Sequence, residues 1–134
     1  MKFKIMILIS AILLSACASS GAGNGHGYVT SVPQVVMQDS MFRVNIQRVN
    51  GKQPIDSRQY QVPAGEATIR VSLILDRNYA PQLVSAVEKI FTQELTFNVT
   101  AGVTYQVGAK VDLQASGEDQ MSGNFWEPVI YREN

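Results

Sequence analysis

The chain has almost none of the side chains on which enzyme active sites are most often built. Its 134 residues include one cysteine, Cys17, and one histidine, His26. A Ser-His-Asp or Cys-His device needs an imidazole base, and a zinc site needs several histidine or cysteine ligands. His26 lies among glycines, where we expect a solvated linker residue. We therefore expect no enzyme, no metal site and no cofactor bound by the folded part.

An excess of charge of one sign is also missing, since 11 basic residues stand against 11 acidic ones. Without a basic stripe, nucleic acid is not an expected partner. Glu118, Asp119 and Glu127 could supply the two carboxyl groups that a glycosidase uses, but acids in a Gly/Ser loop favour a solvated turn. The glycines of residues 21–27 lack the Lys-Ser/Thr that completes a phosphate-binding loop.

The N-terminus carries the pattern of a secretory signal. Lys2 and Lys4 supply two positive charges, residues 5–14 are almost wholly apolar, and small residues close the run. These three features in this order are typical of a signal peptide. The apolar run is about half of the ~20 residues that a membrane-spanning helix needs. We predict a signal peptide over residues 1–16.

This signal ends in Leu14-Ser15-Ala16-Cys17, which resembles the lipobox of bacterial lipoproteins. The resemblance implies cleavage between Ala16 and Cys17 and attachment of a diacylglyceryl group, usually with a further acyl chain, to Cys17. Two or more chains hold a protein stably on a membrane. Ala18, which is not aspartate, implies the periplasmic leaflet of the outer membrane in a Gram-negative cell. Ordinary secretory cleavage stays open as the alternative.

Glycine, alanine and serine follow the lipobox. Residues 18–27 contain nothing to bury, so they are expected to form a flexible coil with a reach of roughly 16–19 Å. We divide the chain into a signal peptide, 1–16, a lipidated Cys and tether, 17–33, and a folded domain, 34–134. Because Cys17 is committed to lipid, this domain has no thiol for a disulfide. Its roughly 100 residues suffice for one modest core.

The folded part alternates apolar and polar residues with the period of two that predicts β-strands. Turn residues separate the runs, at Asn50-Gly51, Pro63-Ala64-Gly65 and Ala101-Gly102. The runs expected as strands are 28–36, 42–49, 58–62, 67–75, 95–99, 103–113 and 124–132. About seven strands with this spacing predict an all-β fold, a small antiparallel β-sandwich.

Three positions complicate this pattern. Residues 81–91 place apolar side chains at helical spacing after a proline, although part of the set also fits an extended chain. A short helix is favoured there, and the strand stays open. Residues 114–123 are expected to form an exposed loop. Pro128, inside the last strand, predicts an edge position or a bulge.

A second resemblance covers roughly residues 44–109. Val49-Asn50-Gly51-Lys52, Tyr60-Gln61-Val62-Pro63-Ala64-Gly65 and Ile69-Arg70-Val71 are similar to the turn-and-strand pattern of PEGA-like β-domains. Residues 97–109 resemble the later part of small proteobacterial lipoproteins of uncharacterised function. Asn50 replaces the aspartate of the pattern, and Ala67 stands where histidine is common. The resemblance implies a β-sandwich and a cell-envelope setting, and it implies no reaction.

These features together predict a membrane-anchored envelope lipoprotein with a noncatalytic structural or protein-interaction role. It would bind an envelope protein through a sheet edge or a loop. The alternative is a sandwich that binds glycan or peptidoglycan fragments by aromatic stacking. The contact residues expected for either role are Trp126, Tyr60 and Tyr131, with Tyr28 as a further stacking residue. A buried Trp126 beside an open edge strand would favour the protein partner.

Overall fold

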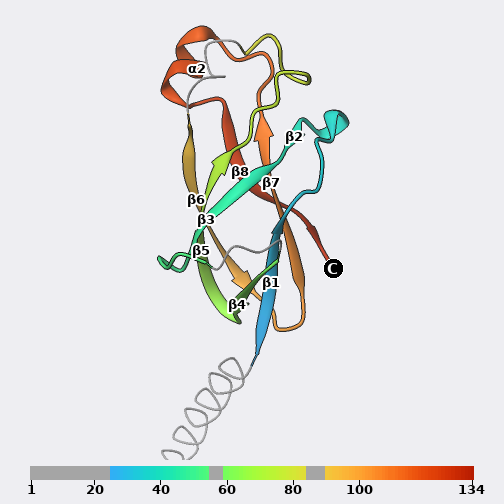
Figure 1. The fold of residues 1–134 in the computed structure, drawn as a ribbon, viewed down its shortest axis with the longest axis vertical. Helices are drawn as coiled ribbons and strands as arrows, with labels where there is room; N and C mark the ends of the chain where they lie inside the picture. The colour runs from blue at the N-terminus through green and yellow to red at the C-terminus, as the bar shows by residue number, and fades with distance from the viewer. Residues whose placement is uncertain (1–24, 55–58, 84–89) are drawn as a thin grey trace, which may run out of the picture.

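The computed structural model describes residues 25–54, 59–83 and 90–134, which form a small all-β sandwich, as predicted. Eight strands lie in two sheets that face one another (Figure 1). The strands are β1 (His26–Ser31), β2 (Met41–Phe42), β3 (Val44–Val49), β4 (Tyr60–Pro63), β5 (Gly65–Leu73), β6 (Thr92–Val99), β7 (Thr104–Val111) and β8 (Trp126–Glu133). A 3-10 turn, η1 (Met37–Asp39), and a helix, α2 (Gly117–Ser122), complete the described elements.

The larger sheet, sheet A, is organised around β7. β8 pairs antiparallel with β7 on one side, while β1 and then β2 pair with successive parts of its other side. β4 pairs with the outer side of β1. The β1–β7 pair is parallel, from Tyr28 opposite Thr104 to Ser31 opposite Val107, so the sandwich is mixed rather than wholly antiparallel. Parallel neighbours need a long connection, and here most of the chain lies between the two strands.

The smaller sheet, sheet B, has the order β3-β5-β6 and is antiparallel throughout. β5 is its central strand and pairs with β6 from Gly65 opposite Val99 to Ser72 opposite Thr92. The period-two prediction for this strand is confirmed, because Ala67, Ile69 and Val71 are each at most 1% exposed. These side chains meet the inner face of sheet A and form one core with it. The other members that are almost fully buried include Val29, Phe42, Val62, Val107 and Ala109.

The predicted boundary between tether and domain, at residue 33, is wrong. β1 begins at His26 and lies inside sheet A, between β4 and β7. Gly27 passes so close to the β6–β7 turn that a Cβ there would lie 2.8 Å from the Val103 carbonyl oxygen. Composition suggests a flexible glycine, whereas this glycine is needed because no side chain fits. His26 is exposed, as expected, but its ring stacks edge-on against Tyr28 at 5.4 Å.

The predicted turns lie where expected, although one has a different role. Asn50 and Gly51 have φ values of +50° and +77°, the positive values that Asn-Gly favours in a tight turn. The turn is closed by a bridge between Val49 and Lys52. It does not join β3 to β4 as a hairpin, because β3 pairs with β5 while β4 pairs with β1. The Pro128 prediction is confirmed, since β8 is an edge strand paired only with β7.

The helix lies in a segment that the sequence analysis assigned to a loop, 114–123. Ser116 caps α2, because its Oγ accepts a hydrogen bond from the Asp119 N–H at 3.1 Å. Gly123 ends the helix in the left-handed conformation, at φ +87°. These are standard helix start and stop residues. The helix favoured over 81–91 falls largely on residues 84–89, outside the described residues. The described parts are a turn up to a buried Leu83, and the exposed Ile90.

Candidate functional site

A recess in the described surface follows the outer edge of β3. β3 belongs to sheet B, and the strands facing it across the gap, β1 and β4, belong to sheet A. β4 is short and pairs with β1 only from His26 to Val29. β1 therefore continues past the end of β4, and the space beside Thr30 and Ser31 is open toward β3. We call the resulting recess, which is lined by residues 30–33 and 43–46 together with Tyr60 and Ile74, the β3 groove.

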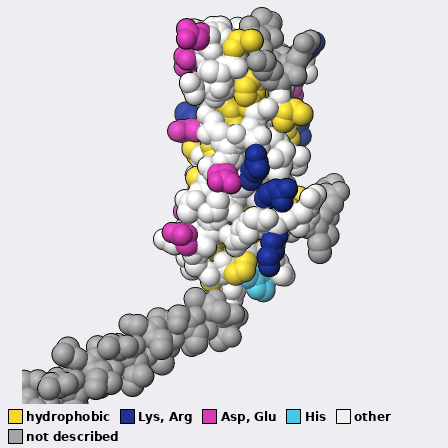
Figure 2. Space-filling model, turned by 90° about the vertical axis from the view of Figure 1, so that its left-hand side faces the viewer, with side chains coloured by type: hydrophobic (Ala, Val, Ile, Leu, Met, Phe, Trp, Pro, Cys, Tyr) yellow, Lys and Arg dark blue, Asp and Glu magenta, His cyan; other side chains and the backbone are white. Residues whose placement is uncertain are grey.

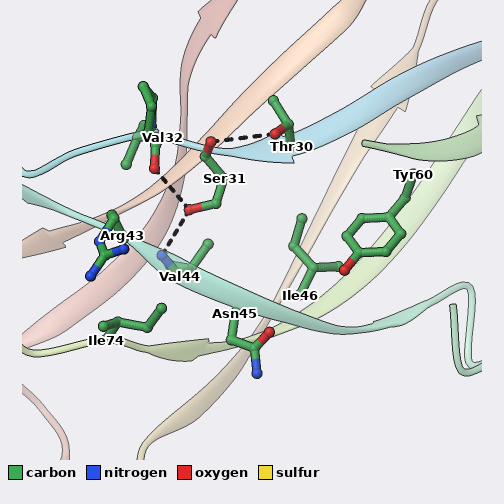
Figure 3. A pocket seen from close by; sticks show the side chains of 10 residues that line it. Thr30, Ser31, Val32, Arg43, Val44, Asn45, Ile46, Tyr60 and Ile74 are labelled. Atoms are coloured by element: carbon green, nitrogen blue, oxygen red, sulfur yellow. Dashed lines mark hydrogen bonds between the residues drawn. The ribbon is translucent and has the colours of Figure 1, made fainter. Parts of the chain in front are cut away.

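Figure 3 shows the part of the groove beside the start of β3, a hollow of about 560 Å³. The Tyr60 side chain points from β4 toward Ile46 on β3. At the other end, the Val44 N–H donates a hydrogen bond to Ser31 Oγ at 3.0 Å, which ties β3 to β1. Polar and apolar side chains both line the hollow. The lining residues used below are Ser31, Arg43, Val44, Ile46 and Tyr60.

Two further hollows extend the groove along the rest of β3. One, of about 500 Å³, lies beside Gln47 and Arg48, and the other, of about 570 Å³, lies beside the Asn50-Gly51 turn and includes Lys52. Tyr60 lines all three hollows, so one half-buried aromatic ring marks the middle of the groove. A row of hollows along the edge of a strand suits an extended peptide segment, whose side chains can enter the hollows.

The groove is electropositive. Arg43, Arg48 and Lys52 line it, and no carboxylate is among its described lining residues. Arg48 is exposed and lies opposite Arg70 in the β3–β5 ladder, while Arg70 lies opposite Glu94 of β6. Basic side chains are seen close together on one side of the molecule in Figure 2. Like charges placed opposite one another in a sheet are unfavourable, so an anionic group bound beside Arg48 would relieve that repulsion.

The main chain of β3 is available only in part. The Val44 N–H is bonded to Ser31, and the Val49 N–H donates to the Lys52 carbonyl at 2.9 Å. The β3–β5 register also shifts between Ile46 and Arg48, and such a bulge limits strand pairing. A partner in this groove would therefore bind mainly through side chains in the hollows, with main-chain pairing limited to the centre of β3.

The structure separates the three predicted contact residues. Tyr60 lies at the centre of the groove, on the β4 edge of sheet A. Tyr131 lies on β8, at the opposite edge, where its hydroxyl donates to Asp39 Oδ2 at 2.6 Å and Arg132 covers its ring at 5.2 Å. Trp126 is 6% exposed and belongs to the core. The prediction of Trp126 as a contact residue is wrong, because its ring packs between the sheets.

The acidic residues considered from sequence lie in two separate elements of the described part of the chain. Glu118 and Asp119 belong to the first turn of α2, where acids favour the helix, and Glu127 lies on β8. No group of three or more metal-ligating side chains occurs among the residues that the structure describes. Cys17 and Ala16 lie outside them, so lipidation and cleavage remain predictions. No described helix is long and apolar enough to cross a membrane.

Sequence reasoning missed the basic residues of the groove. Arg43, Arg48 and Lys52 lie within ten residues of one another around one strand and its turn. That clustering was visible in the sequence, but its meaning depends on β4, which begins at Tyr60, pairing with β1 and leaving the edge of β3 open. A pairing between distant strands cannot be deduced from local alternation, so no sequence pattern could place Tyr60 beside Arg48.

Comparison with protein-family models, with curated proteins and with solved structures gave no match for this chain. The likeness to bacterial lipoproteins and to PEGA-like domains therefore rests on the quoted motifs alone. The geometry of the β3 groove carries the functional argument below.

Proposed function

We propose that this protein is a membrane-anchored envelope lipoprotein whose β-domain binds another envelope protein and catalyses no reaction. The lipid on Cys17 would hold the domain at the periplasmic leaflet of the outer membrane. The β3 groove would receive an extended, acidic segment of the partner. The observation that carries this proposal is the groove itself, with Tyr60 at its centre and three basic side chains along it.

The alternative, glycan binding by aromatic stacking, would be favoured by an exposed Trp126 beside other aromatic rings. Trp126 is buried, and Tyr60 and Tyr131 lie at opposite edges of sheet A. Tyr60 is thus the one predicted stacking residue that lines the groove. A buried tryptophan and an open recess beside an edge strand favour the protein partner over the glycan.

A charge reversal in the groove provides the test. Arg48→Glu should weaken capture of the partner from crosslinked membranes by about tenfold, because it removes a positive charge and adds a negative one beside an acidic segment. The fold should survive, since a glutamate opposite Arg70 replaces a like-charge pair by an attractive one. Capture is measured by quantitative mass spectrometry of proteins retained on the full-length, tagged chain.

Arg77→Glu is the matched control, because it makes the same change of net charge at an exposed loop residue away from the groove. It should leave capture unchanged. Equal capture by the Arg48 and Arg77 variants would contradict the groove. Binding of the unsubstituted chain to purified peptidoglycan, with no protein depending on Arg48, would favour the glycan alternative instead.

A further inference from the structure

We infer that the open edge of β6 pairs with β6 of a second copy of this chain, antiparallel, so that the two B sheets join into one six-stranded sheet. This pairing uses a surface separate from the β3 groove and would form a twofold symmetric dimer. β6 lies at the edge of sheet B opposite to β3, at the outer side of the sandwich in Figure 1. In the described part of the chain, no strand pairs with its outer side.

The main chain of β6 is oriented for such pairing. The Leu73 N–H donates to the Phe91 carbonyl at 3.0 Å, and bonded pairs alternate along an antiparallel ladder. Odd-numbered residues of β6 therefore turn their N–H and C=O groups toward β5. The even-numbered residues turn theirs toward the open edge: Thr92, Glu94, Thr96 and Asn98. The β5–β6 register runs without a shift over all eight residues of β6.

The side chains beside this edge are incompletely covered. Leu95 and Phe97 point to the core face of sheet B, yet each is only partly buried. Phe97 also stacks edge-on against Tyr105 at 5.1 Å between ring centroids. A further strand beside β6 would cover the outer flanks of Leu95 and Phe97 and so bury more apolar surface.

A second copy fits this edge in one register without a charge conflict. With Thr96 opposite Thr96 of the other copy, Leu95 lies opposite Phe97, and Glu94 lies opposite Asn98. The bonded pairs then fall on even-numbered residues, as the main chain requires. Glu94 is the only charged residue of β6, so no like charges meet. Aromatic–aliphatic pairs of this kind stabilise neighbouring strands.

The other edges carry features that interrupt or shorten the ladder. β6 carries one charged residue, Glu94, and the Gln93 side chain donates to the Trp126 carbonyl at 2.7 Å, but its main chain has neither a bulge nor a proline. β3 has its register shift and its bond to Ser31. β4 has four residues and ends in Pro63. β8 contains Pro128 and ends in charged residues. Natural sheets protect their edges with bulges, prolines, charges and short strands. A long, regular edge with a single charged residue is therefore expected to have a partner strand.

Variants of Thr96 test this inference on the full-length chain in detergent, with molar mass measured by light scattering across a concentration series. Thr96→Pro removes an N–H that faces the open edge and makes no hydrogen bond to β5. An edge strand tolerates proline at such a position. Thr96→Lys places two ammonium groups opposite each other. Each should raise the dimer dissociation constant at least about tenfold. Thr96→Ala, which loses the hydroxyl that contacts Thr68 Oγ1 at 2.8 Å but keeps the N–H, should remain dimeric.

The register is tested with a short bismaleimide crosslinker. Thr96→Cys should give a covalent dimer, while Lys110→Cys, on sheet A, and the unsubstituted chain with Cys17 should not. A chain that is monomeric at every concentration would overturn the inference, and so would Lys and Pro variants that dimerise as the unsubstituted chain does. Loss of the dimer with retention of partner capture, or the reverse, shows which of the two proposed surfaces has failed.

Discussion

Replacing Cys17 with serine should abolish lipid attachment completely. Cells supplied with labelled palmitate should label the unsubstituted chain and leave the Cys17→Ser chain unlabelled, because serine has no thiolate to form the thioether. The variant should also keep its signal peptide, residues 1–16, which an intact-mass measurement detects. The physical consequence is large, since two or more acyl chains anchor a protein almost permanently while a short apolar run does so weakly.

A variant with its cysteine at another position tests whether labelling requires a thiol at position 17 or only a cysteine somewhere near it. The double variant Cys17→Ser/Ser19→Cys keeps one cysteine but moves it two residues from the lipobox position. It should also stay unlabelled. Label on either variant, or a mature unsubstituted chain that begins elsewhere than at Cys17, would contradict the lipoprotein assignment and favour ordinary secretory cleavage.

Gly27→Ala should destabilise the domain by about 3 kcal/mol, the upper end of what overpacking costs. The added Cβ would lie 2.7 Å from Val99 Cγ1, and 2.8 and 3.0 Å from the carbonyl oxygens of Val103 and Thr100. Two of these contacts are with backbone, which cannot rotate away. We expect a fall of about 10 °C or more in the unfolding temperature, measured by circular dichroism on the full-length chain.

Gly117→Ala is the matched control, because a Cβ at Gly117 would meet nothing within 4 Å. Alanine favours a helix over glycine by up to about 1 kcal/mol, so this change at the start of α2 should be neutral or stabilising. Equal unfolding temperatures for Gly27→Ala and the unsubstituted chain would mean that Gly27 belongs to a tether after all, and that β1 does not pack as described.

The contrast between these two glycines shows what the sequence could predict. The strands with strong alternation, above all β5, follow from local pattern because one face of each must be buried. β1 was not predicted to begin at His26, because composition assigns Gly25 and Gly27 to a tether, whereas both are needed for close approach to the β6–β7 turn. α2 could have been predicted from its ends, since Ser116 and Gly123 are ordinary cap residues. Its six residues, however, are too few to show helical periodicity.

Only one residue of the candidate site, Tyr60, was predicted from the sequence. Tyr60 was predicted as a contact residue because it is aromatic, and its position in the groove arises from the pairing of β4 with β1 rather than with β3. Trp126 was misassigned because an aromatic in an edge strand can face either side, and the β7–β8 register turns this one to the core opposite Val111. Which strands become neighbours is set by the whole core and has no local pattern.

The central claim, that the β3 groove receives a protein partner in the cell envelope, is tested most directly by crosslinking from the groove itself. Tyr60 is replaced by the photoreactive analogue p-benzoylphenylalanine in the full-length chain, and intact cells are irradiated. Tyr79, an exposed tyrosine on a loop outside the groove, receives the same replacement as control. We predict a discrete crosslinked protein from position 60 that is absent from position 79 and is lost when Arg48→Glu is added. No crosslink from Tyr60, or the same crosslinks from both positions, would contradict the claim.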